Sequence, residues 1–571
     1  MAIDKSAPGT VSANTTGSSK IVITGKDTKV LDDIFGGGYA TGAKASAHVK
    51  ETSIVLTDVS LGTDAAKVNV YAGGYADNGA KTSTEKASIT LNNTTVVGGI
   101  FAGGKTVATP PANGNTRAAS SATSIVGEAT ITLIDSTVKG AVDVTGVTED
   151  KSALVFTGAN TVETVTGAAS DITFNATNAK APVLTLGEKG SIDMSKDKEI
   201  VVTNAQAGTQ LVDGKVSVAK DTTVKVTSDF GETVFTVTED LKDAANLTLT
   251  GAGLALGEST IKPAELKVSA NSKTLSEAYL GSLAFVNQGA EFIADEGLRA
   301  IRAAAKADAF TAFGAMTGGQ SKYETGSNVK VKGVTLAAGT AGQFGNTTVA
   351  GFVEAGWASS DSNVSGTKAD ADHDYYGVGA LVRYDFDTPF YLDGSLRIGQ
   401  ISTEFDGSFG AGKAKYDADS LYTTAHLGGG YVFDLAPGVK LDAYGRYVLS
   451  YLKGDDVTLD SVAREGFDMD DTTTHAVRIG ARVTGEYQAI NWYTGLAYEH
   501  VFDGKAEGKL NTYGISAALD APELKGDSAI LDLGFTMKPS EMSPFTMGLG
   551  LKGYAGDRKG VAGNMSVLYT F

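Results

Sequence analysis

The chain has 571 residues, with 71 Gly, 10 Pro and no Cys, and its formal net charge is −18. This composition favours extensive β-structure over a helical enzyme, and a negative charge without a basic patch excludes a nucleic-acid partner. No run of about 18 apolar residues exists, so any membrane span has to be made of strands.

The first residues give an expectation about the cellular compartment. Residues 1–20 contain no apolar signal-peptide core, so we expect the mature form of an exported chain. The absence of Cys suits a chain that crosses an oxidising compartment unfolded. The signal peptide of the precursor is not identified by the sequence.

Residues 1–274 contain a degenerate repeat of short β-branched runs. Each run is followed by a polar turn and a second short β run. Short β runs separated by Gly and Asn corners are typical of a parallel β-solenoid, in which apolar side chains stack inside successive coils. The clearest runs are Ile21–Ile23, Ile54–Leu56, Ile89–Leu91 and Ile131–Leu133, and weaker ones are Leu184–Leu186, Ile200–Val202, Val224–Val226 and Leu247–Leu249.

An aromatic-glycine box follows three of these runs, at Ile34–Tyr39, Val70–Tyr75 and Ile100–Gly104. Its aromatic residues, Phe35, Tyr71 and Phe101, suit either a stack inside the coils or sugar binding, and we favour the internal stack. Polar loops at residues 40–50, 76–86 and 105–126 project from one edge, where we expect any ligand contact.

Residues 275–306 form the best helix of the chain, rich in Ala and poor in Gly. Ser276 is the expected N-cap, and Gly289 or Gly297 is a possible break. A helix of about 20 residues is about 30 Å long, enough to thread a barrel lumen. In that case Arg299 and Arg302 would face carboxylates of the barrel wall, whereas the alternative is a linker helix on the surface.

Residues 307–571 break into twelve segments that alternate between apolar and polar residues. An even number of strands suits a closed antiparallel barrel, because an open strand edge cannot be satisfied in hydrocarbon. The alternation directs several charges into the lumen, and a lumen that carries both signs favours a plugged pore. A soluble β-sandwich is the alternative. The segments begin near Ala307, Val329, Thr347, Asp374, Pro389, Ser420, Val439, Thr472, Ala489, Ser528, Pro544 and Val561, and the lumen charges are Glu354, Arg383, Arg397, Arg446, Arg478, Arg482 and Asp532.

The final strand alternates with Val567, Tyr569 and Phe571 on one face, which resembles the C-terminal signal of outer-membrane β-barrels. The amino-acid sequences of three stretches resemble the last strands of the autotransporters, a family of type V secretion proteins. These stretches are Ala497–Gly504, Leu524–Phe535 and Asn564–Phe571.

The resemblance implies a surface-displayed passenger (1–274), a helix that stays in the pore (275–306) and a translocator barrel (307–571). It also implies that the barrel assembly machinery inserts the protein among the lipids of the outer membrane. Many relatives cut the passenger at an Asn-Asn pair, but Asn271 and Asn287 stand apart here, so we expect the passenger to stay attached.

Catalytic, cofactor and metal sites are not predicted. The stretch Gly526–Ala529 resembles a serine-nucleophile motif, and Gly407–Ala414 resembles a phosphate-binding loop, but each lacks the other residues that its chemistry requires. Calcium binding is not predicted at Asp370, Asp372 and Asp374, because no bidentate Glu follows at the required position. We therefore expect an all-β exported protein with a non-enzymatic passenger that acts in adhesion or surface interaction. The alternatives are a passenger with unrecognised hydrolase activity and a channel-forming outer-membrane protein. The ligand and the oligomeric state are not predicted.

Overall fold

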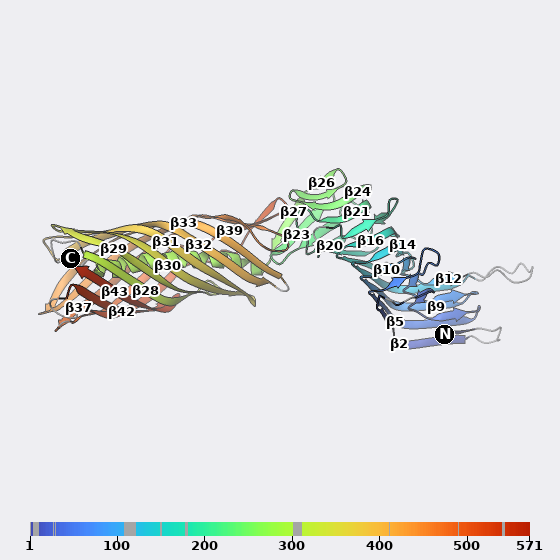
Figure 1. Ribbon diagram of the computed structural model, residues 1–571, viewed down its shortest axis with the longest axis horizontal. Helices are drawn as coiled ribbons and strands as arrows, with labels where there is room; N and C mark the ends of the chain where they lie inside the picture. The colour runs from blue at the N-terminus through green and yellow to red at the C-terminus, as the bar shows by residue number, and fades with distance from the viewer. Residues whose placement is uncertain are drawn as a thin grey trace, which may run out of the picture. The chain divides into compact units, whose positions relative to one another are not determined.

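The computed structural model describes residues 2–3, 11–26, 28, 30–107, 121–148, 151–177, 181–300, 311–409, 412–488, 490–538 and 543–570. The chain forms two compact units, each of which can be followed by colour in Figure 1. The first consists of residues 1–267 with 512–515, and the second of residues 268–511 with 516–571.

The first unit is a β-solenoid built from three sheets. Ten strands form one of these sheets, in the order β2-β5-β9-β13-β15-β17-β20-β22-β23-β27, with parallel pairing from β2 to β22. A thirteen-stranded sheet and the four-stranded sheet β1-β4-β8-β12 complete the coils. The strands are β1 (Ala2–Ile3), β2 (Val11–Thr24), β3 (Ile34–Phe35), β4 (Tyr39–Thr41), β5 (Ala45–Thr57), β6 (Ser60–Leu61), β7 (Val70–Tyr71), β8 (Tyr75–Asp77), β9 (Lys81–Asn92), β10 (Thr95–Val96), β11 (Ile100–Phe101), β12 (Lys105–Val107), β13 (Thr123–Ile134), β14 (Thr137–Asp143), β15 (Ser152–Thr157), β16 (Asn160–Thr166), β17 (Asp171–Asn175), β18 (Leu184–Leu186), β19 (Ser191–Asp193), β20 (Glu199–Thr203), β21 (Gln210–Val218), β22 (Thr223–Thr227), β23 (Gly231–Thr236), β24 (Leu241–Thr250), β25 (Gly253–Leu256), β26 (Ser259–Ile261) and β27 (Pro263–Val268).

The predicted runs stack in register and form the solenoid core. Ile54 pairs with Ile21 on one side and with Ile89 on the other, and Ile89 pairs in turn with Ile131. Ile54, Ile89 and Ile131 are buried. Burying an aliphatic side chain of this size contributes about 1.5–3 kcal/mol. Because neighbouring coils cover each other's core residues, each coil depends on the next for its stability.

The polar corners that follow these runs adopt a left-handed backbone conformation. Asp58, Asn93 and Asp135 have φ angles of 54°, 46° and 45°. Asn and Asp tolerate this region better than other residues with a side chain, because their short polar groups bond locally. Asn93 Nδ2 also donates to Asp58 Oδ1 at 2.6 Å, so the side chains of successive corners are joined.

The parallel coils do not continue to the end of the first unit. β23 is antiparallel to β22, and β24 is antiparallel to both β21 and β25. The run Leu247–Leu249 therefore lies in an antiparallel hairpin instead of a further coil. Antiparallel strands at this position cover the open edge and the apolar interior that a last parallel coil would expose.

The second unit contains a closed barrel of twelve antiparallel strands, as predicted, and the β-sandwich alternative is wrong. The barrel strands are β28 (Thr311–Tyr323), β29 (Val329–Phe344), β30 (Thr347–Val364), β31 (Thr367–Asp385), β32 (Phe390–Phe409), β33 (Gly412–Ala436), β34 (Val439–Leu452), β37 (Thr472–Tyr487), β38 (Ile490–Val501), β41 (Gly526–Met537), β42 (Phe545–Gly556) and β43 (Arg558–Thr570). A small sheet between strand ends contains β35 (Asp456–Thr458), β36 (Gly466–Met469), β39 (Gly508–Thr512) and β40 (Ile515–Ala518).

Two barrel strands begin well before their predicted starts, by seven and eight residues. β31 begins at Thr367 instead of near Asp374, and β33 begins at Gly412 instead of near Ser420. The added residues are polar on their outward face, so apolar alternation does not reveal that they belong to a strand. Hydrogen bonding to neighbouring strands extends β-structure beyond the apolar part of the wall.

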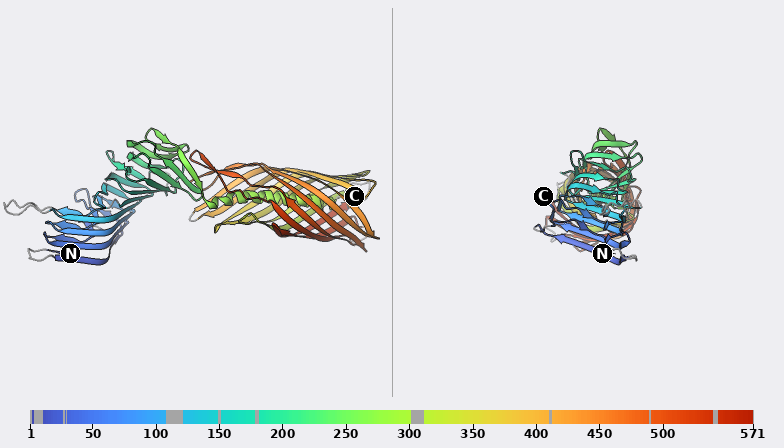
Figure 2. Two further views of the ribbon diagram at one scale, coloured as in Figure 1. Left: turned by 180° about the vertical axis from the view of Figure 1, so that it is seen from behind. Right: turned by 90° about the vertical axis from the view of Figure 1, so that its right-hand side faces the viewer.

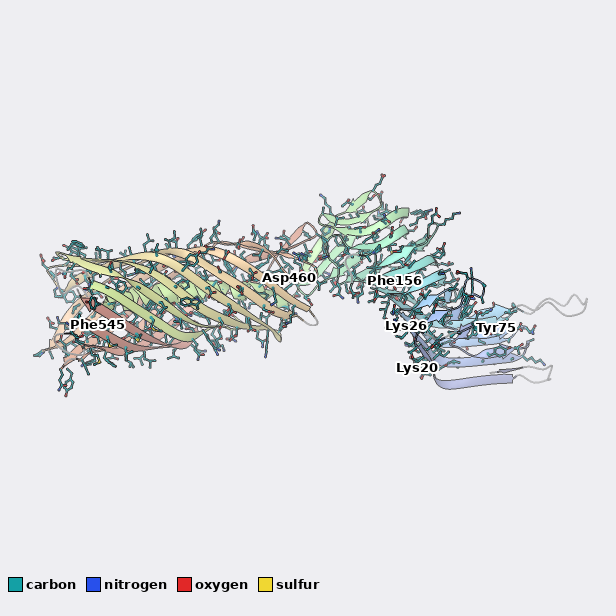
Figure 3. The ribbon with its side chains drawn as sticks, in the orientation of Figure 1. Lys20, Lys26, Tyr75, Phe156, Asp460 and Phe545 are labelled. Atoms are coloured by element: carbon teal, nitrogen blue, oxygen red, sulfur yellow. The ribbon has the colours of Figure 1, made fainter. Side chains whose placement is uncertain are left out.

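The barrel wall has an apolar outside and a polar inside. On β31 the exposed fractions of Tyr376 and Val378 are 62% and 53%, whereas Arg383 is 3% exposed. Large exposed apolar side chains recur on every barrel strand except β28, and they include Phe545, which Figure 3 labels. Among the helices within the described residues, none is long and apolar enough to cross a membrane.

Candidate functional site: the helix inside the barrel

A helix fills the barrel lumen. α1 (Lys273–Phe292) follows a short 3-10 turn, η1 (Ala270–Ser272), and continues as the π-helical segment η2 (Ile293–Gly297). Its residues are buried from Thr274 to Val286, and Figure 2 shows it surrounded by barrel strands. The alternative of a surface linker helix is therefore wrong.

The expected ends of the helix need correction. Ser272, not Ser276, precedes the first helical residue, because the η1 turn starts the helical path earlier. Neither Gly289 nor Gly297 ends the helical path. A Cβ at Gly289 would lie 2.5 Å from Arg397 Nη2 and 2.6 Å from the Tyr375 hydroxyl. Gly289 thus allows the wall to approach the helix closely.

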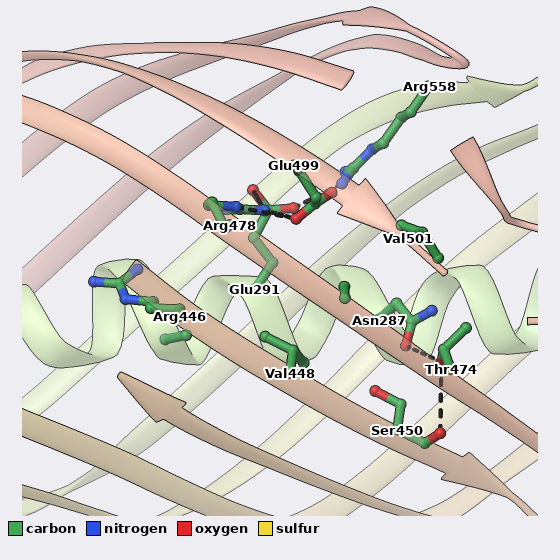
Figure 4. A pocket seen from close by; sticks show the side chains of 12 residues that line it. Asn287, Glu291, Arg446, Val448, Ser450, Thr474, Arg478, Glu499, Val501 and Arg558 are labelled. Atoms are coloured by element: carbon green, nitrogen blue, oxygen red, sulfur yellow. Dashed lines mark hydrogen bonds and ion pairs between the residues drawn. The ribbon is translucent and has the colours of Figure 1, made fainter. Parts of the chain in front are cut away.

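Two carboxylates of the helix meet several cations of the wall. Asp295 Oδ2 lies 2.7 Å from Lys552 Nζ and 2.9 Å from Arg478 Nη1, and Arg446 contacts Asp295 Oδ1. Glu291, one turn earlier, lies 2.7 Å from Arg558 Nη1. Figure 4 shows Glu291 between the wall residues Arg478 and Arg558.

We call this cluster of charges the helix lock. It consists of Glu291, Asp295, Arg446, Arg478, Arg482, Lys552 and Arg558. Further groups of the wall bond to its members. Tyr554 donates to Glu291 Oε1 at 2.8 Å. Glu499 and Asp532 on the wall pair with Arg478 and Arg482. A buried charge is tolerated when it is paired and hydrogen-bonded, so the lock holds the helix in one position.

A second polar contact ties the helix to the wall. Arg397 is fully buried, pairs with Glu354 at 2.9 Å and donates from Nη1 to the carbonyl oxygen of Val286 at 3.2 Å. The Tyr422 hydroxyl donates to Glu354 Oε1 at 2.6 Å. The pair thus fixes the wall strands and one turn of the helix together.

All seven lumen charges named from the sequence are buried inside the barrel. Arg446, Arg478 and Arg482 meet in the helix lock, and Asp532 lies beside Arg482. Arg383 does not reach the helix lock: it pairs with Asp385 and lies 3.9 Å from Asp393.

The predicted helix residues and the C-terminal residues are only partly described. Arg299 pairs with Glu296, lies over the Tyr493 ring and is 3.8 Å from Asp532 Oδ2. Val567 pairs with Gly314 in the strand register, and Tyr569 packs against Phe545. Arg302 and Phe571 lie outside the described residues.

Glu291 and Asp295 were missed by the sequence argument, which looked for cations on the helix and carboxylates on the wall. The sequence did contain a sign of this ion cluster, since the two carboxylates are four residues apart on the helix. Like charges at this spacing repel one another unless cations lie nearby.

A second candidate site lies on the outside of the solenoid. Phe35, Tyr71 and Phe101 form one column with centroids 5.0 and 4.7 Å apart, and Tyr39 stacks on Tyr75 at 5.1 Å. These five residues are named the aromatic strip, and Tyr75 is labelled in Figure 3.

The expected stack of Phe35, Tyr71 and Phe101 is present, but these rings are not part of the aliphatic core of the coils. The rings stack on one another, but the buried residues beside them in the strands, Ile34, Val70 and Ile100, point into the core instead. Since strand side chains alternate between faces, the strip points outward. Tyr39 is 41% exposed and Phe35, Tyr75 and Phe101 are partly exposed, whereas Tyr71, stacked between Phe35 and Phe101, is buried at 8%.

An ion pair borders the aromatic strip. Lys105 Nζ lies 2.8 Å from Asp33 Oδ2 and 5.8 Å from the centroid of the Tyr71 ring, and the Asn69 backbone amide donates to Asp33 Oδ1 at 2.9 Å. Burial raises the pKa of the Asp33 carboxyl, but the hydrogen bonds from Lys105 and Asn69 outweigh burial and leave this pKa below its ordinary value.

The lowered pKa of Asp33 makes part of the solenoid stability pH-dependent. This contribution is present above the unfolded-state pKa of about 4 and is lost as the pH falls through the lower folded-state pKa. We expect Asp33→Asn to reduce the free energy of unfolding by up to about 1 kcal/mol at neutral pH and to have almost no effect near pH 2. Denaturant titrations of the solenoid transition in the full chain at both pH values measure this difference, and an equal loss at both would contradict the prediction.

Comparison with known proteins places the barrel in context. A family model described as the autotransporter β-domain matches residues 305–550. The translocator domain of autotransporter NalP from Neisseria meningitidis is 17% identical, with a TM-score of 0.42, over 52% of this chain and 99% of that structure. The transport unit of autotransporter AIDA-I from Escherichia coli is 14% identical, with a TM-score of 0.34, over 47% of this chain and 91% of that one. No curated protein matches the chain.

Proposed function

The chain is an autotransporter with its β-domain at residues 305–550, and from this premise we propose that its solenoid is an attached, non-enzymatic binding module that acts in adhesion. The barrel lies in the outer membrane and secretes the solenoid as a passenger, which is displayed outside. Insertion by the barrel assembly machinery is part of the proposal.

The aromatic strip is the observation that supports a binding role. All three tyrosines of residues 1–267 belong to it. Elsewhere in the passenger, the stacked rings of Phe156 and Phe174 are completely buried. Tyr is enriched at interfaces because its ring supplies apolar area while its hydroxyl bonds to polar groups.

The charge beside the strip is balanced. Asp33 and Lys105 neutralise each other, so the strip offers rings and phenolic hydroxyls without a dominant sign of charge. Such a surface favours a partner that is itself largely uncharged, by apolar contact and neutral hydrogen bonds.

Attachment of the passenger is supported by the helix lock. With several buried ion pairs around Asp295, withdrawal of the helix requires charges to be separated in a low-dielectric lumen.

Cell adhesion tests the binding role. We expect cells that display the Tyr39→Ala, Tyr75→Ala double variant to adhere about tenfold less to epithelial monolayers than cells that display the unchanged chain, because hot-spot rings often contribute 2 kcal/mol or more. Antibody staining of intact cells measures the displayed amount.

Leu31→Ala is the matched control, since Leu31 is 77% exposed and lies outside the strip. Its adhesion is expected to equal that of the unchanged chain. Equal adhesion by the double variant at equal display would refute the role of the strip.

A further inference from the structure

Lysines line up across three adjacent barrel strands on the outer face. In the strand register Lys322 of β28 lies opposite Lys559 of β43 on one side and opposite Lys330 of β29 on the other. Lys332 lies two residues further along β29 and is exposed, as are Lys322 and Lys559. Lys322, Lys330, Lys332 and Lys559 are named the lysine row.

The lysine row is electrostatically unfavourable when no ligand is bound to it. Like charges directly opposite each other in a sheet destabilise the pairing. Three carboxylates are near: Glu324 pairs with Lys559 at 2.8 Å, Asp557 also attracts Lys559, and Asp361 is the register partner of Lys330. The row nevertheless concentrates more positive than negative charge on one side of the barrel.

The lysine row lies at the rim from which the helix leads to the passenger. The β28–β29 turn meets the start of the helix, where Lys273 Nζ donates to the carbonyl oxygen of Thr325 at 2.9 Å and Ser327 bonds to Glu277. Since the passenger is displayed outside, this rim is in the outer leaflet.

The lysine row lies at the depth of the lipid headgroups. Two residues below Lys559 and Lys332 on the same outward faces are Val561 and Val334, where the exposed apolar surface begins. Two residues span about 7 Å of strand. The ammonium groups therefore lie just above the hydrocarbon.

An apolar hollow lies on the same strands below the lysine row. Its volume is about 440 Å³, and Leu336, Ala338 and Met565 are among the residues that line it. Leu336 is six residues from Lys330, about 20 Å along the strand. At a strand tilt of about 40° this corresponds to a depth of roughly 15 Å, which is one leaflet of a 30 Å hydrocarbon core.

We propose that the lysine row and the hollow form one binding site for a phosphorylated lipid of the outer leaflet. The ammonium groups bind the headgroup phosphate, and the hollow holds the end of an acyl chain. Charge-assisted bonds to phosphate offset the repulsion between the lysines. This site is independent of the proposed adhesive role.

Binding of bisphosphorylated lipid A to the full chain in dodecyl maltoside tests the site, with native mass spectrometry to quantify the complex. We expect Lys322→Gln, Lys330→Gln to weaken binding by about tenfold or more, and inorganic phosphate to compete poorly. The thermal stability without lipid is expected to be unchanged or higher, since the repulsion is removed.

Two further variants separate the site from general effects. Lys440→Gln, on an exposed lysine near the β33–β34 turn at the opposite rim, is expected to bind lipid A normally. Ala338→Trp fills the hollow and is expected to weaken binding of lipid A while leaving the lysine row intact. Unchanged binding by the double Gln variant, a loss of its stability without lipid, or equal competition by inorganic phosphate would each overturn the proposal.

Discussion

Asp295→Asn is expected to unlock the helix from the barrel. Asp295 is 2% exposed and contacts Lys552, Arg478 and Arg446. Removing one partner from a buried ion network leaves uncompensated charge, which costs about 3–5 kcal/mol. We expect a lower unfolding temperature of the barrel in detergent. In planar bilayers we expect more frequent openings to a higher conductance, because the helix leaves its place more often.

A double variant provides the matched control for the helix lock. Asp295→Asn combined with Lys552→Gln removes one charge of each sign, so the loss is expected to be smaller than the sum of the two single losses. Asp434→Asn, on an exposed pair with Lys440, is expected to change neither quantity. If Asp295→Asn kept both the stability and the conductance of the unchanged chain, the lock would not be what holds the helix.

Gly74→Ala is expected to separate two coils of the passenger. A Cβ at Gly74 would lie 2.3 Å from the carbonyl oxygen of Gly38 and 3.0 Å from Thr82 Cβ. The backbone oxygen cannot rotate away as a side chain can, so the coils have to move apart. The cost of such overpacking is about 3 kcal/mol. We expect the passenger transition to occur at lower denaturant concentration and trypsin to cleave the passenger faster.

Gly17→Ala is the control, because a Cβ at that position meets no atom within 4 Å. Its passenger is expected to unfold within about 1 kcal/mol of the unchanged one. The barrel transition is expected to be the same in both variants, since the barrel has its own core. An unchanged passenger transition for Gly74→Ala would show that the coils relax around the added carbon.

Much of the fold follows from local patterns. The run Ile89–Leu91 and the corner residue Asn93 predict a strand and a tight turn, because side-chain alternation and the left-handed backbone are properties of neighbouring residues. Alternation along β31 likewise predicts which face of the strand is polar. Leu247–Leu249 shows the limit, since the same local pattern suits a parallel coil and an antiparallel hairpin.

The candidate site required the tertiary structure. Arg446, Arg478 and Arg482 are inward-facing from alternation alone, but their common partner Asp295 comes from a helix that is more than a hundred residues away in the chain. Helical periodicity does not tell which helix residue faces which strand. The lysine row likewise required the tertiary structure, because Lys559 and Lys322 become neighbours only when the first and last strands close the barrel.

The sequence by itself determined the elements of this protein: a solenoid of stacked β runs, a helix and a barrel of twelve strands with an apolar outside. These depend on periodicity and turn residues, which act over a few positions. The tertiary structure decided which charges meet, where the aromatic rings point and how the strands are aligned. The physical reason is that ion pairing, close glycine contacts and strand register depend on distances between segments far apart in the chain, and packing alone sets those distances.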